Sequence, residues 1–241
     1  MKFLNKKRIL IKISGESLAG EGGINNSLHS PMLLKISDEI AQVVNEGYQV
    51  AIVVGGGNFY RGISGAEKLG IDRCTSDYMG MMATVMNALA LRSAIQVKKI
   101  DCRVMSALPL QAVAETYAQP KAIHHLRKNR VVIFAAGTGN PMFTTDTAAA
   151  LRASEMRCGL VLKATKVKGV YDKDPKKYND AIFLKNISFK EVQERNLKIM
   201  DESAISLLKE NKIPLGVFSI FEDNSLINVL NGVSEFTLVD I

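Results

Sequence analysis

Apolar runs of strand length alternate along this chain with longer segments whose apolar residues recur at helical spacing. This alternation is typical of βαβ units, in which helices pack on a mainly parallel sheet. We therefore expect an α/β protein with three layers, α/β/α, and a mainly parallel central sheet. Strands are predicted at Arg8–Ser14, Gln49–Val54, Cys102–Ser106, Arg130–Ala135, Gly159–Lys163 and Leu215–Ser219. Helices are predicted from about Ser30 to Gly47 and at Asp77–Gln96, Lys121–Asn129, Thr144–Met156, Ser188–Asn196 and Glu202–Asn211.

Several of these helices carry signals at their ends. Ser30-Pro31 combines an N-cap residue with a first-turn proline, and Gly47 can end the same helix. Ser188 and Glu191 have the spacing of a capping box, and Asn211 can stop the helix that precedes it.

The predicted helix at Asp77–Gln96 is apolar on nearly all sides. A helix of this kind is buried in a globular protein. Packing within the core explains the pattern, and a subunit interface on the outer face of the helix is the alternative. Its methionines are Met79, Met81, Met82 and Met86.

The size and charge of the chain limit the classes of ligand. The 241 residues, 47% of them apolar, can bury a large core as one domain or as two lobes that share a sheet. The formal net charge of +7 favours anionic ligands. Zinc-finger spacing, an aromatic RNA-binding signature and heptads behind a basic helix are all lacking. A phosphorylated small molecule therefore fits the charge, and nucleic-acid binding is not expected.

The cysteine pattern indicates a reducing, cytoplasmic environment. Cys74, Cys102 and Cys158 lie far apart without a C-x-x-C pair, so neither a disulfide framework nor a zinc site is expected. The apolar stretch after Lys6-Lys7-Arg8 is interrupted by Lys12 and lacks a small-residue cleavage site, which argues against a signal peptide.

The most apolar long segment runs from Met79 to Leu91 and is interrupted by Gly80, Thr84 and Asn87. It is too short to cross the hydrocarbon core of a bilayer, which is about 30 Å thick. No membrane span is therefore expected.

Unusual sequences follow four of the predicted strands. In an open parallel sheet, ligands bind beyond the carboxyl ends of the strands, so these loops are the candidates for a site. They contain two glycine runs, two strand-end lysines and an arginine able to grip phosphate oxygens. The loops are Lys12–Glu16, Gly55–Gly62 with Arg61, Gly137–Pro141 leading to a helix start at Thr144-Thr145-Asp146, and Lys163–Tyr171 followed by Asp172–Pro175.

Each loop alone has a simpler interpretation, because glycine runs often form only tight turns and strand-end lysines are often solvated. Together the four loops supply what phosphoryl transfer needs, which is positioning of the reactants and neutralisation of negative charge.

Familiar nucleotide and hydrolase motifs are incomplete in this sequence. Glu21 and Gly22 replace the Lys and Ser or Thr of a Walker A loop. Tyr60 and Met142 replace the last glycine of a dinucleotide fingerprint. No G-x-S-x-G elbow occurs, and the histidines lie without a plausible nucleophile beside them.

Four motifs carry a family resemblance: Lys12–Glu16, Gly55–Asn58 with Arg61, Gly137–Pro141 through Asp146, and Lys163–Lys166. They resemble the motifs of the bacterial UMP kinases, a family of the amino-acid-kinase superfamily, and the resemblance extends from about residue 8 to the C-terminus. It implies a carbamate-kinase-like fold in a single domain, with an acceptor lobe at about 1–160 and an ATP lobe at about 161–241. It also implies phosphorylation of UMP to UDP in pyrimidine nucleotide biosynthesis, with ATP and Mg²⁺.

The resemblance implies roles for individual residues. For ATP binding these are Lys12, Ile13, Ser14, Gly15, Gly57, Arg61, Thr165, Tyr171 and Asp174. For UMP binding they are Gly56, Asp77, Thr138, Gly139, Asn140, Pro141, Met142, Phe143, Thr144 and Thr145. Catalytic roles fall on Lys12 and Lys163, which would flank the transferred phosphoryl group, and on Asp146 and Asp201, which would hold the lysines. Asp77 can accept hydrogen bonds from ribose hydroxyls, and Asn140 can pair with the polar edge of uracil.

The implied reaction is a direct in-line attack by a UMP phosphate oxygen on the γ-phosphate of ATP. Magnesium would enter with ATP, since the sequence shows no dedicated carboxylate cage and no protein metal site is expected. The resemblance further implies a homohexamer with GTP as an activator and UTP as an inhibitor. Two departures from the family bear on these roles. Lys168 stands where an acidic residue is common, and Gly20–Asn25 is shorter than the glycine-containing effector region of the family.

Two other functions are open. A carboxylate or carbamate kinase of the same superfamily would share the glycine loops, but Asp77 together with the loop from Gly137 to Asp146 favours UMP. A noncatalytic nucleotide-binding protein on the same fold would be favoured by loss of Lys12 or Lys163, and both lysines are present.

Overall fold

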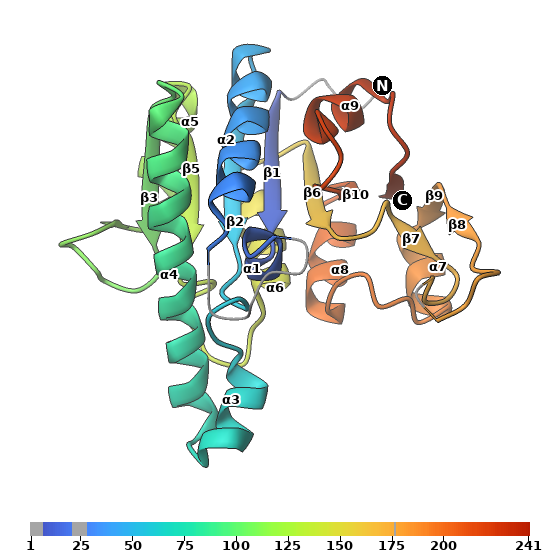
Figure 1. Ribbon diagram of the computed structural model, residues 1–241, viewed down its shortest axis with the longest axis horizontal. Coiled ribbons are helices and arrows are strands. Elements are labelled where there is room, and N and C mark those ends of the chain that lie inside the picture. Colours follow the sequence, from blue (N-terminus) through green and yellow to red (C-terminus); the bar gives the residue numbers. More distant parts are fainter. Residues whose placement is uncertain (1–6, 21–27, 176) are drawn as a thin grey trace.

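The computed structural model describes residues 7–20, 28–175 and 177–241, and a nine-stranded sheet forms its centre (Figure 1). The strands lie in the order β4 (Glu115–Thr116), β3 (Cys102–Ser106), β5 (Val131–Ala135), β2 (Gln49–Val54), β1 (Arg8–Ile13), β6 (Leu160–Thr165), β10 (Leu215–Ser219), β11 (Thr237–Asp240) and β9 (Asn186–Ser188). Within the described residues, neighbouring strands of this sheet are parallel except β10 and β11. The expected mainly parallel sheet is confirmed.

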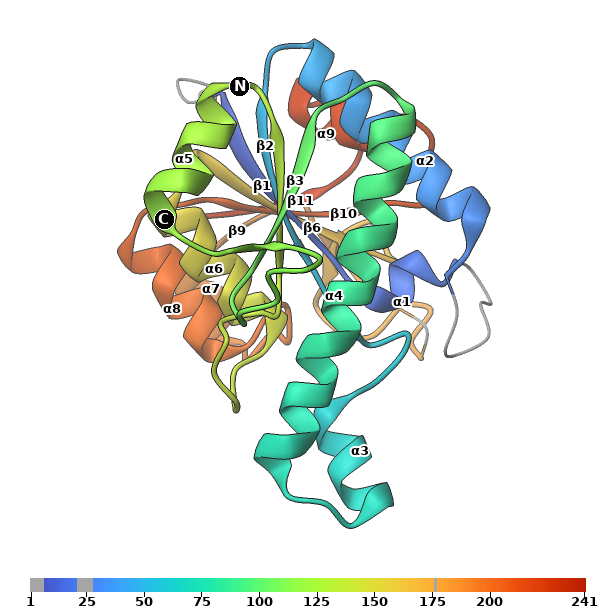
Figure 2. The same ribbon diagram turned by 90° about the vertical axis from the view of Figure 1, so that its left-hand side faces the viewer.

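Helices cover both faces of the sheet, which confirms the expected three layers (Figure 2). One face is covered by α2 (Ser30–Asn45), α4 (Arg73–Val97) and α9 (Ser225–Asn231). The other face is covered by α5 (Gln119–Arg127), α6 (Thr145–Glu155), α7 (Phe189–Glu194) and α8 (Glu202–Glu210).

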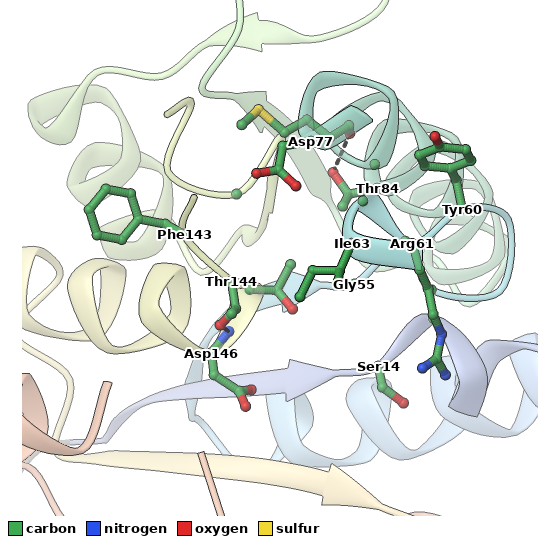
Figure 3. A pocket seen from close by; sticks show the side chains of 18 of the residues that line it. Ser14, Gly55, Tyr60, Arg61, Ile63, Asp77, Thr84, Phe143, Thr144 and Asp146 are labelled. Carbon is green, nitrogen blue, oxygen red and sulfur yellow. Dashed lines mark hydrogen bonds between the residues drawn. The ribbon is translucent and has the colours of Figure 1, made fainter. Parts of the chain in front are cut away.

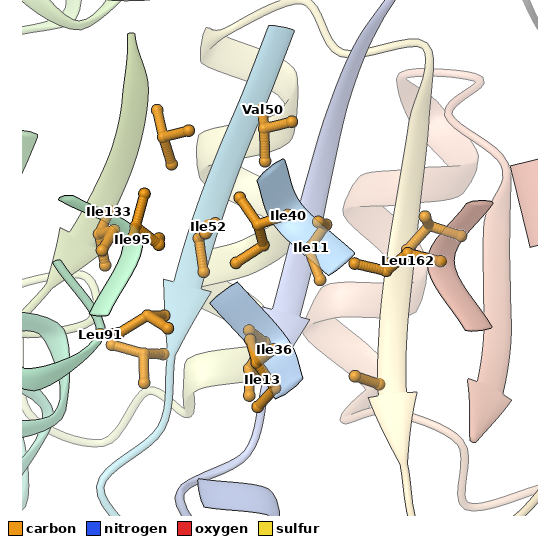
Figure 4. Packing of buried hydrophobic residues seen from close by; sticks show 14 of the residues in the cluster. Ile11, Ile13, Ile36, Ile40, Val50, Ile52, Leu91, Ile95, Ile133 and Leu162 are labelled. Carbon is orange, nitrogen blue, oxygen red and sulfur yellow. The ribbon is translucent and has the colours of Figure 1, made fainter. Parts of the chain in front are cut away.

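The side chains of β1 alternate between the two cores, because successive strand residues point to opposite faces of a sheet. Ile11 and Ile13 are fully buried in the core that contains α2 and α4 (Figure 4). Leu10 lies in the opposite core, with α6 and α8. Lys12 shares the face of Leu10, so its amino group is directed toward the side on which α6 packs.

The helix ends agree in part with the sequence signals. The capping box that begins at Ser188 is confirmed, Asn211 is the C-cap of α8, and Gly47 follows the end of α2 with a φ of +85°. The prediction that Ser30 is an N-cap is wrong. Ser30 is itself the first helical residue, and His29 occupies the N-cap position without a side-chain capping bond.

Helix α4 begins at Arg73, before the predicted start at Asp77, because the Asp72 carboxylate caps it by accepting a hydrogen bond from the Thr75 N–H. Its first half projects away from the sheet together with α3 (Gly62–Leu69) (Figure 2).

The expectation that this methionine-rich helix is buried in the core holds for only one of its sides, and the alternative of a subunit interface on its outer face stays open. Met81 is buried, but the side chains of Met79, Met82 and Met86 are 39%, 44% and 50% exposed. Only one side of α4 packs on the sheet, and the opposite side faces away from it. No helix in the described part of the chain is both long enough and apolar enough to cross a membrane.

Several short elements have no counterpart in the sequence prediction. They include α1 (Gly15–Leu18), α3, α9, β4, β9, β11, and the small pair of β7 (Val170–Tyr171) and β8 (Phe183–Leu184). Segments of so few residues are too short to show a hydrophobic period.

Candidate active site

Two lysines face each other at the carboxyl ends of neighbouring strands. Lys12 on β1 is paired in register with Lys163 on β6. Lys12 Nζ lies 2.8 Å from Asp146 Oδ1, and Lys163 Nζ lies 2.8 Å from Asp146 Oδ2. Asp146 is in the first turn of α6, where its N–H donates to the hydroxyl of the N-cap Thr144. The structure thus brings together three residues that the sequence places in the site.

The charges of this group are set by burial and by mutual attraction. Burial favours the neutral form of Asp146, but Lys12 and Lys163 outweigh this effect and hold the pKa of the carboxyl below its ordinary value of 3.8. Burial lowers the pKa of Lys163 below 10.5, and the charge of Lys12 lowers it further, while Asp146 compensates only in part. Asp146 is therefore held as a carboxylate, and Lys163 loses its proton more easily than an ordinary lysine.

Asp201 lies near this group, but its contacts differ from the sequence expectation. Its Oδ1 accepts hydrogen bonds from Thr147 Oγ1 and from the N–H of Ala204, both at 2.8 Å, and its Oδ2 accepts one from the Thr144 hydroxyl. Among the described residues it forms no ion pair with Lys12 or Lys163. As the N-cap of α8, its carboxylate is engaged in joining α8 to the start of α6, and its charge reaches Lys163 only through space.

The glycines after β1 and β2 pack against each other and against α4. A Cβ on Gly15 would lie 2.6 Å from the Gly57 nitrogen, and one on Gly55 would lie 3.0 Å from the Gly15 nitrogen. A Cβ on Gly56 would lie 2.7 Å from the carbonyl oxygen of Gly80. These positions have no room for a side chain, so backbone groups form this side of the site.

Arg61 follows the glycine loop as the N-cap residue of α3, and its guanidinium pairs with Glu16 of α1. The two side chains are 61% and 41% exposed. A phosphate can therefore replace Glu16 as the partner of the guanidinium, since both anions suit its forked donors.

A cavity of about 630 Å³ lies at this edge of the sheet, with Asp77 and Thr84 of α4 on one side and Ser14 and Asp146 on the other (Figure 3). Most of the predicted residues border this cavity. They are Lys12, Ser14, Gly15, Gly56, Gly57, Arg61, Asp77, Thr138, Phe143, Thr144, Thr145, Asp146 and Asp201.

Five other predicted residues line neither this cavity nor the second cavity described below. The side chain of Ile13 is fully buried in the core, so only its backbone can reach a ligand. Gly139, Asn140, Pro141 and Met142 lie in the loop that borders the cavity but outside its lining.

The loop after β5 has an unusual backbone. Ala136, Gly137, Gly139 and Met142 have φ values of 60°, 56°, 82° and 72°. The Met142 N–H donates to Asp77 Oδ2 at 2.8 Å, which holds this end of the loop against α4.

A second cavity of about 650 Å³ includes Lys163 in its lining, so it adjoins the first through the ion pair of Lys163 with Asp146. The predicted residues Thr165, Tyr171 and Asp174 line it. Apolar side chains beside a tyrosine ring suit a planar heterocycle such as a nucleotide base. The apolar residues of this lining are Val167, Val170, Leu197, Ile199 and Val217.

Sequence reasoning missed the partners of two site residues. Glu16 pairs with Arg61, and Arg73 Nε lies 2.8 Å from Asp77 Oδ1. The spacing of Arg73 and Asp77 is i, i+4, which places both on one helix face. The sequence contains this i, i+4 spacing, but the spacing predicts a contact only if the helix begins before residue 77. The apolar lining residues Leu197 and Ile199 carry no sequence signal.

The two departures from the family have different outcomes. Lys168 forms ion pairs with Glu235 at 3.3 Å and Glu222 at 3.9 Å, and its hydrogen bond to Glu235 raises its pKa. Most of the shortened stretch Gly20–Asn25 lies outside the described residues.

No three His, Cys, Asp or Glu side chains of the described ranges gather as a metal site. Asp146 is the carboxylate between the two lysines, and each of its oxygens already faces one of them. This donor set fits a cation that arrives on the phosphates of a ligand and does not fit one held by protein carboxylates.

The parallel sheet, its glycine loops and the lysine pair bridged by Asp146 define a kinase of the amino acid kinase class. The model of the amino acid kinase family matches residues 7–219. The chain is 49% identical over 228 residues to the uridylate kinase of Campylobacter fetus subsp. fetus, and the aligned region covers 95% of both chains. It is 48% identical over 227 residues to the uridylate kinase of Campylobacter jejuni, and the aligned region covers 94% of both chains.

Solved structures agree with these relatives. The UMP kinase of Ureaplasma parvum superimposes with a TM-score of 0.92 at 38% identity, and the match covers 98% of this chain and 100% of that chain. The UMP kinase of Bacillus anthracis gives a TM-score of 0.92 at 38% identity, covering 97% and 96%. The chain belongs to the amino acid kinase family and, within it, to the uridylate kinases.

Proposed function

We propose that this protein transfers the γ-phosphoryl group of ATP to UMP, giving ADP and UDP, as a step in pyrimidine nucleotide biosynthesis. The observation that carries the proposal is the position of Asp146 between Lys12 and Lys163, where the two cavities adjoin. Phosphoryl transfer requires that donor and acceptor phosphates meet where negative charge is neutralised. The relatives support UMP as the acceptor.

The two cavities support a division of the single domain into an acceptor lobe, about 1–160, and an ATP lobe, about 161–241. UMP occupies the first cavity, between Asp77 and the loop from Thr138 to Thr145. The adenosine of ATP occupies the second, beside Tyr171, and its phosphates extend past Lys163 toward the residues from Lys12 to Gly15 and toward Gly57.

In this arrangement a phosphate oxygen of UMP attacks the γ-phosphorus of ATP. The bond from the γ-phosphorus to the β–γ bridging oxygen breaks, and its electron pair leaves with ADP. Lys12 and Lys163 neutralise the charge of the transferred group, and Asp146 fixes the positions of both ammonium groups. No phosphoenzyme intermediate is needed, because donor and acceptor react directly.

Several further properties belong to the same proposal. Magnesium, held by the phosphates of ATP, would supply additional neutralisation of their charge. The protein assembles as a homohexamer, and the exposed methionines of α4 support a subunit interface on this helix, because exposed apolar patches mark interfaces. GTP activates the enzyme and UTP inhibits it. The cysteine pattern supports a cytoplasmic location.

Separation of the products of ATP with UMP, CMP, glutamate or aspartate tests the function. We expect UDP and ADP in equal amounts with UMP. Phosphorylation of a carboxylate in preference to UMP would instead assign the other branch of the superfamily. Binding of ATP and UMP without UDP formation would indicate a noncatalytic nucleotide-binding protein.

A further inference from the structure

Three residues interrupt the apolar stretch Met79–Leu91 of α4: Gly80, Thr84 and Asn87. With Asp77 they recur at the spacing of one helix face. Asp77, Gly80 and Thr84 line the first cavity, and Asn87 is fully buried. The polar face of α4 is therefore directed at the site.

Thr84 holds the start of the loop that follows β5. Its side chain is 3% exposed, and its Oγ1 accepts a hydrogen bond from the Ala136 N–H at 2.7 Å and donates one to the Met81 carbonyl at 2.7 Å. Ala136 has a φ of +60°, a conformation that residues with a side chain seldom adopt. Such a conformation persists only when neighbouring groups hold it. The Thr84 hydroxyl is such a group.

This contact reaches the acceptor side of the site through the backbone. Ala136 directly precedes the loop that carries Thr138 and Phe143 to the first cavity. Asp77 holds the other end of the loop through the Met142 N–H. Helix α4 thus fixes the loop at both ends.

Asn87 makes the corresponding contacts to the glycine loop. Its Nδ2 donates to the Gly55 carbonyl oxygen and to Asn58 Oδ1, both at 2.7 Å, and Asn58 Nδ2 donates back to Asn87 Oδ1 at 3.1 Å. Both asparagine side chains are buried. Thr84 and Asn87 lie one turn apart, so the acceptor loop and the glycine loop are attached to the same turn of one helix.

We propose that Thr84 and Asn87 are positioning residues for phosphoryl transfer. Thr84 sets the acceptor loop, Asn87 sets the glycine loop, and the helical turn between them sets the spacing of the two loops. The inference rests on the proposed function, in which the first loop binds UMP and the second contacts both substrates. Loss of the Thr84 hydroxyl then acts on UMP alone, whereas loss of the Asn87 amide acts on both substrates and on turnover.

Steady-state UDP formation by Thr84→Val, Thr84→Ser and Asn87→Ala tests this division. We expect Thr84→Val to raise the KM for UMP about fivefold or more, the effect of one lost buried hydrogen bond, with the KM for ATP within about twofold of wild type. Thr84→Ser keeps the hydroxyl and should restore the KM for UMP. Asn87→Ala should lower kcat and raise both KM values.

A matched control is Ser37→Ala on α2, because Ser37 is also fully buried and its hydroxyl donates to the Leu34 carbonyl at 2.7 Å. It should lower the melting temperature without changing either KM. Thr84→Ala replaces Thr84→Val if the valine variant does not fold. An unchanged KM for UMP in a folded variant without the hydroxyl, or equal changes in both KM values, would overturn the role of Thr84. A wild-type enzyme that forms no UDP would overturn the proposed function and this inference with it.

Discussion

Lys12 and Lys163 stand opposite each other in register on adjacent parallel strands, and each ammonium group lies 2.8 Å from its own oxygen of Asp146. The two ammonium groups repel each other, and the carboxylate between them offsets this repulsion and holds both groups at one place. Positive charge placed in this way acts most strongly on the oxygens of a phosphoryl group during its transfer.

Replacement of Lys12 by alanine is expected to lower kcat about 100-fold or more, because it removes one charge that stabilises the transition state. The KM values for UMP and ATP should change less. Steady-state UDP formation measures both, with circular dichroism as a check on folding. Lys190→Ala removes an exposed lysine of α7 and should leave kcat unchanged. A folded Lys12→Ala variant with near-normal kcat would exclude Lys12 from the mechanism.

The lowered pKa of Lys163 predicts the alkaline side of the pH profile. Burial lowers this pKa below 10.5, and the charge of Lys12 adds to the effect. We expect kcat to fall as the pH rises through a value below 10.5, where Lys163 loses its charge. Lys163→Arg keeps the charge at every accessible pH, so the fall should move to higher pH. Rates at saturating substrate between about pH 7 and 11 measure the shift. The same alkaline limb in both enzymes would assign it to another group.

Asp146 predicts how stability depends on acid. Burial raises the pKa of this carboxyl, but Lys12 and Lys163 lower it further than burial raises it, so the folded pKa lies below 3.8. Stability from this group is therefore fully present above the unfolded value of 3.8 and is lost as the pH falls through the folded value.

Asp146→Asn should accordingly unfold more easily than wild type at neutral pH, by about 3 kcal/mol, because it removes the carboxylate shared by the buried Lys12 and the partly buried Lys163. The difference should shrink below pH 3.8. Urea unfolding over a series of pH values measures it. Asp223→Asn removes a carboxylate that is 92% exposed, and its effect should be small throughout. A constant difference between Asp146→Asn and wild type at every pH would contradict the assignment.

Asp77 combines a predicted role with a contact that only the structure reveals. The family resemblance implies a contact with the ribose of UMP, and the structure shows its Oδ2 accepting the Met142 N–H and its Oδ1 paired with Arg73. We expect Asp77→Asn to raise the KM for UMP more than the KM for dUMP, which lacks one ribose hydroxyl. Equal increases would mean that Asp77 acts on the acceptor only by holding the loop.

Much of the fold could be predicted because buried parallel strands read as continuous apolar runs. Each of these runs ends at the edge of the sheet where ligands bind, so their position alone makes Lys12 and Lys163 candidate site residues. The exposure of Met82 and Met86 could not be predicted, since apolar content does not show which sides of a helix find a partner within the chain.

The contacts of several site residues could not be predicted, because they depend on which helices and strands end near one another in the fold. Asp201 caps α8 and accepts from Thr144 and Thr147, a choice that requires the start of α6 to lie beside α8. Thr84 is similar, because its partner Ala136 is distant in the sequence and adopts a backbone conformation that its residue type does not indicate. Local patterns identify such residues only as polar interruptions of an apolar helix.

The exposed methionines of α4 give a prediction about assembly. Met79, Met82 and Met86 recur at the spacing of one helix face and are at least 39% exposed. A face of this kind is stabilised by burial against another subunit, and a charge placed at its centre would have to be buried without a partner. We expect Met82→Lys to dissociate the proposed homohexamer into smaller species in light scattering coupled to size-exclusion chromatography. Val233→Lys changes an apolar residue near the C-terminus that is 76% exposed, and the mass of this variant in solution should equal that of wild type. An unchanged mass for Met82→Lys would place the subunit interface on another face, and the polar side of α4 would then hold the two loops without help from a neighbouring subunit.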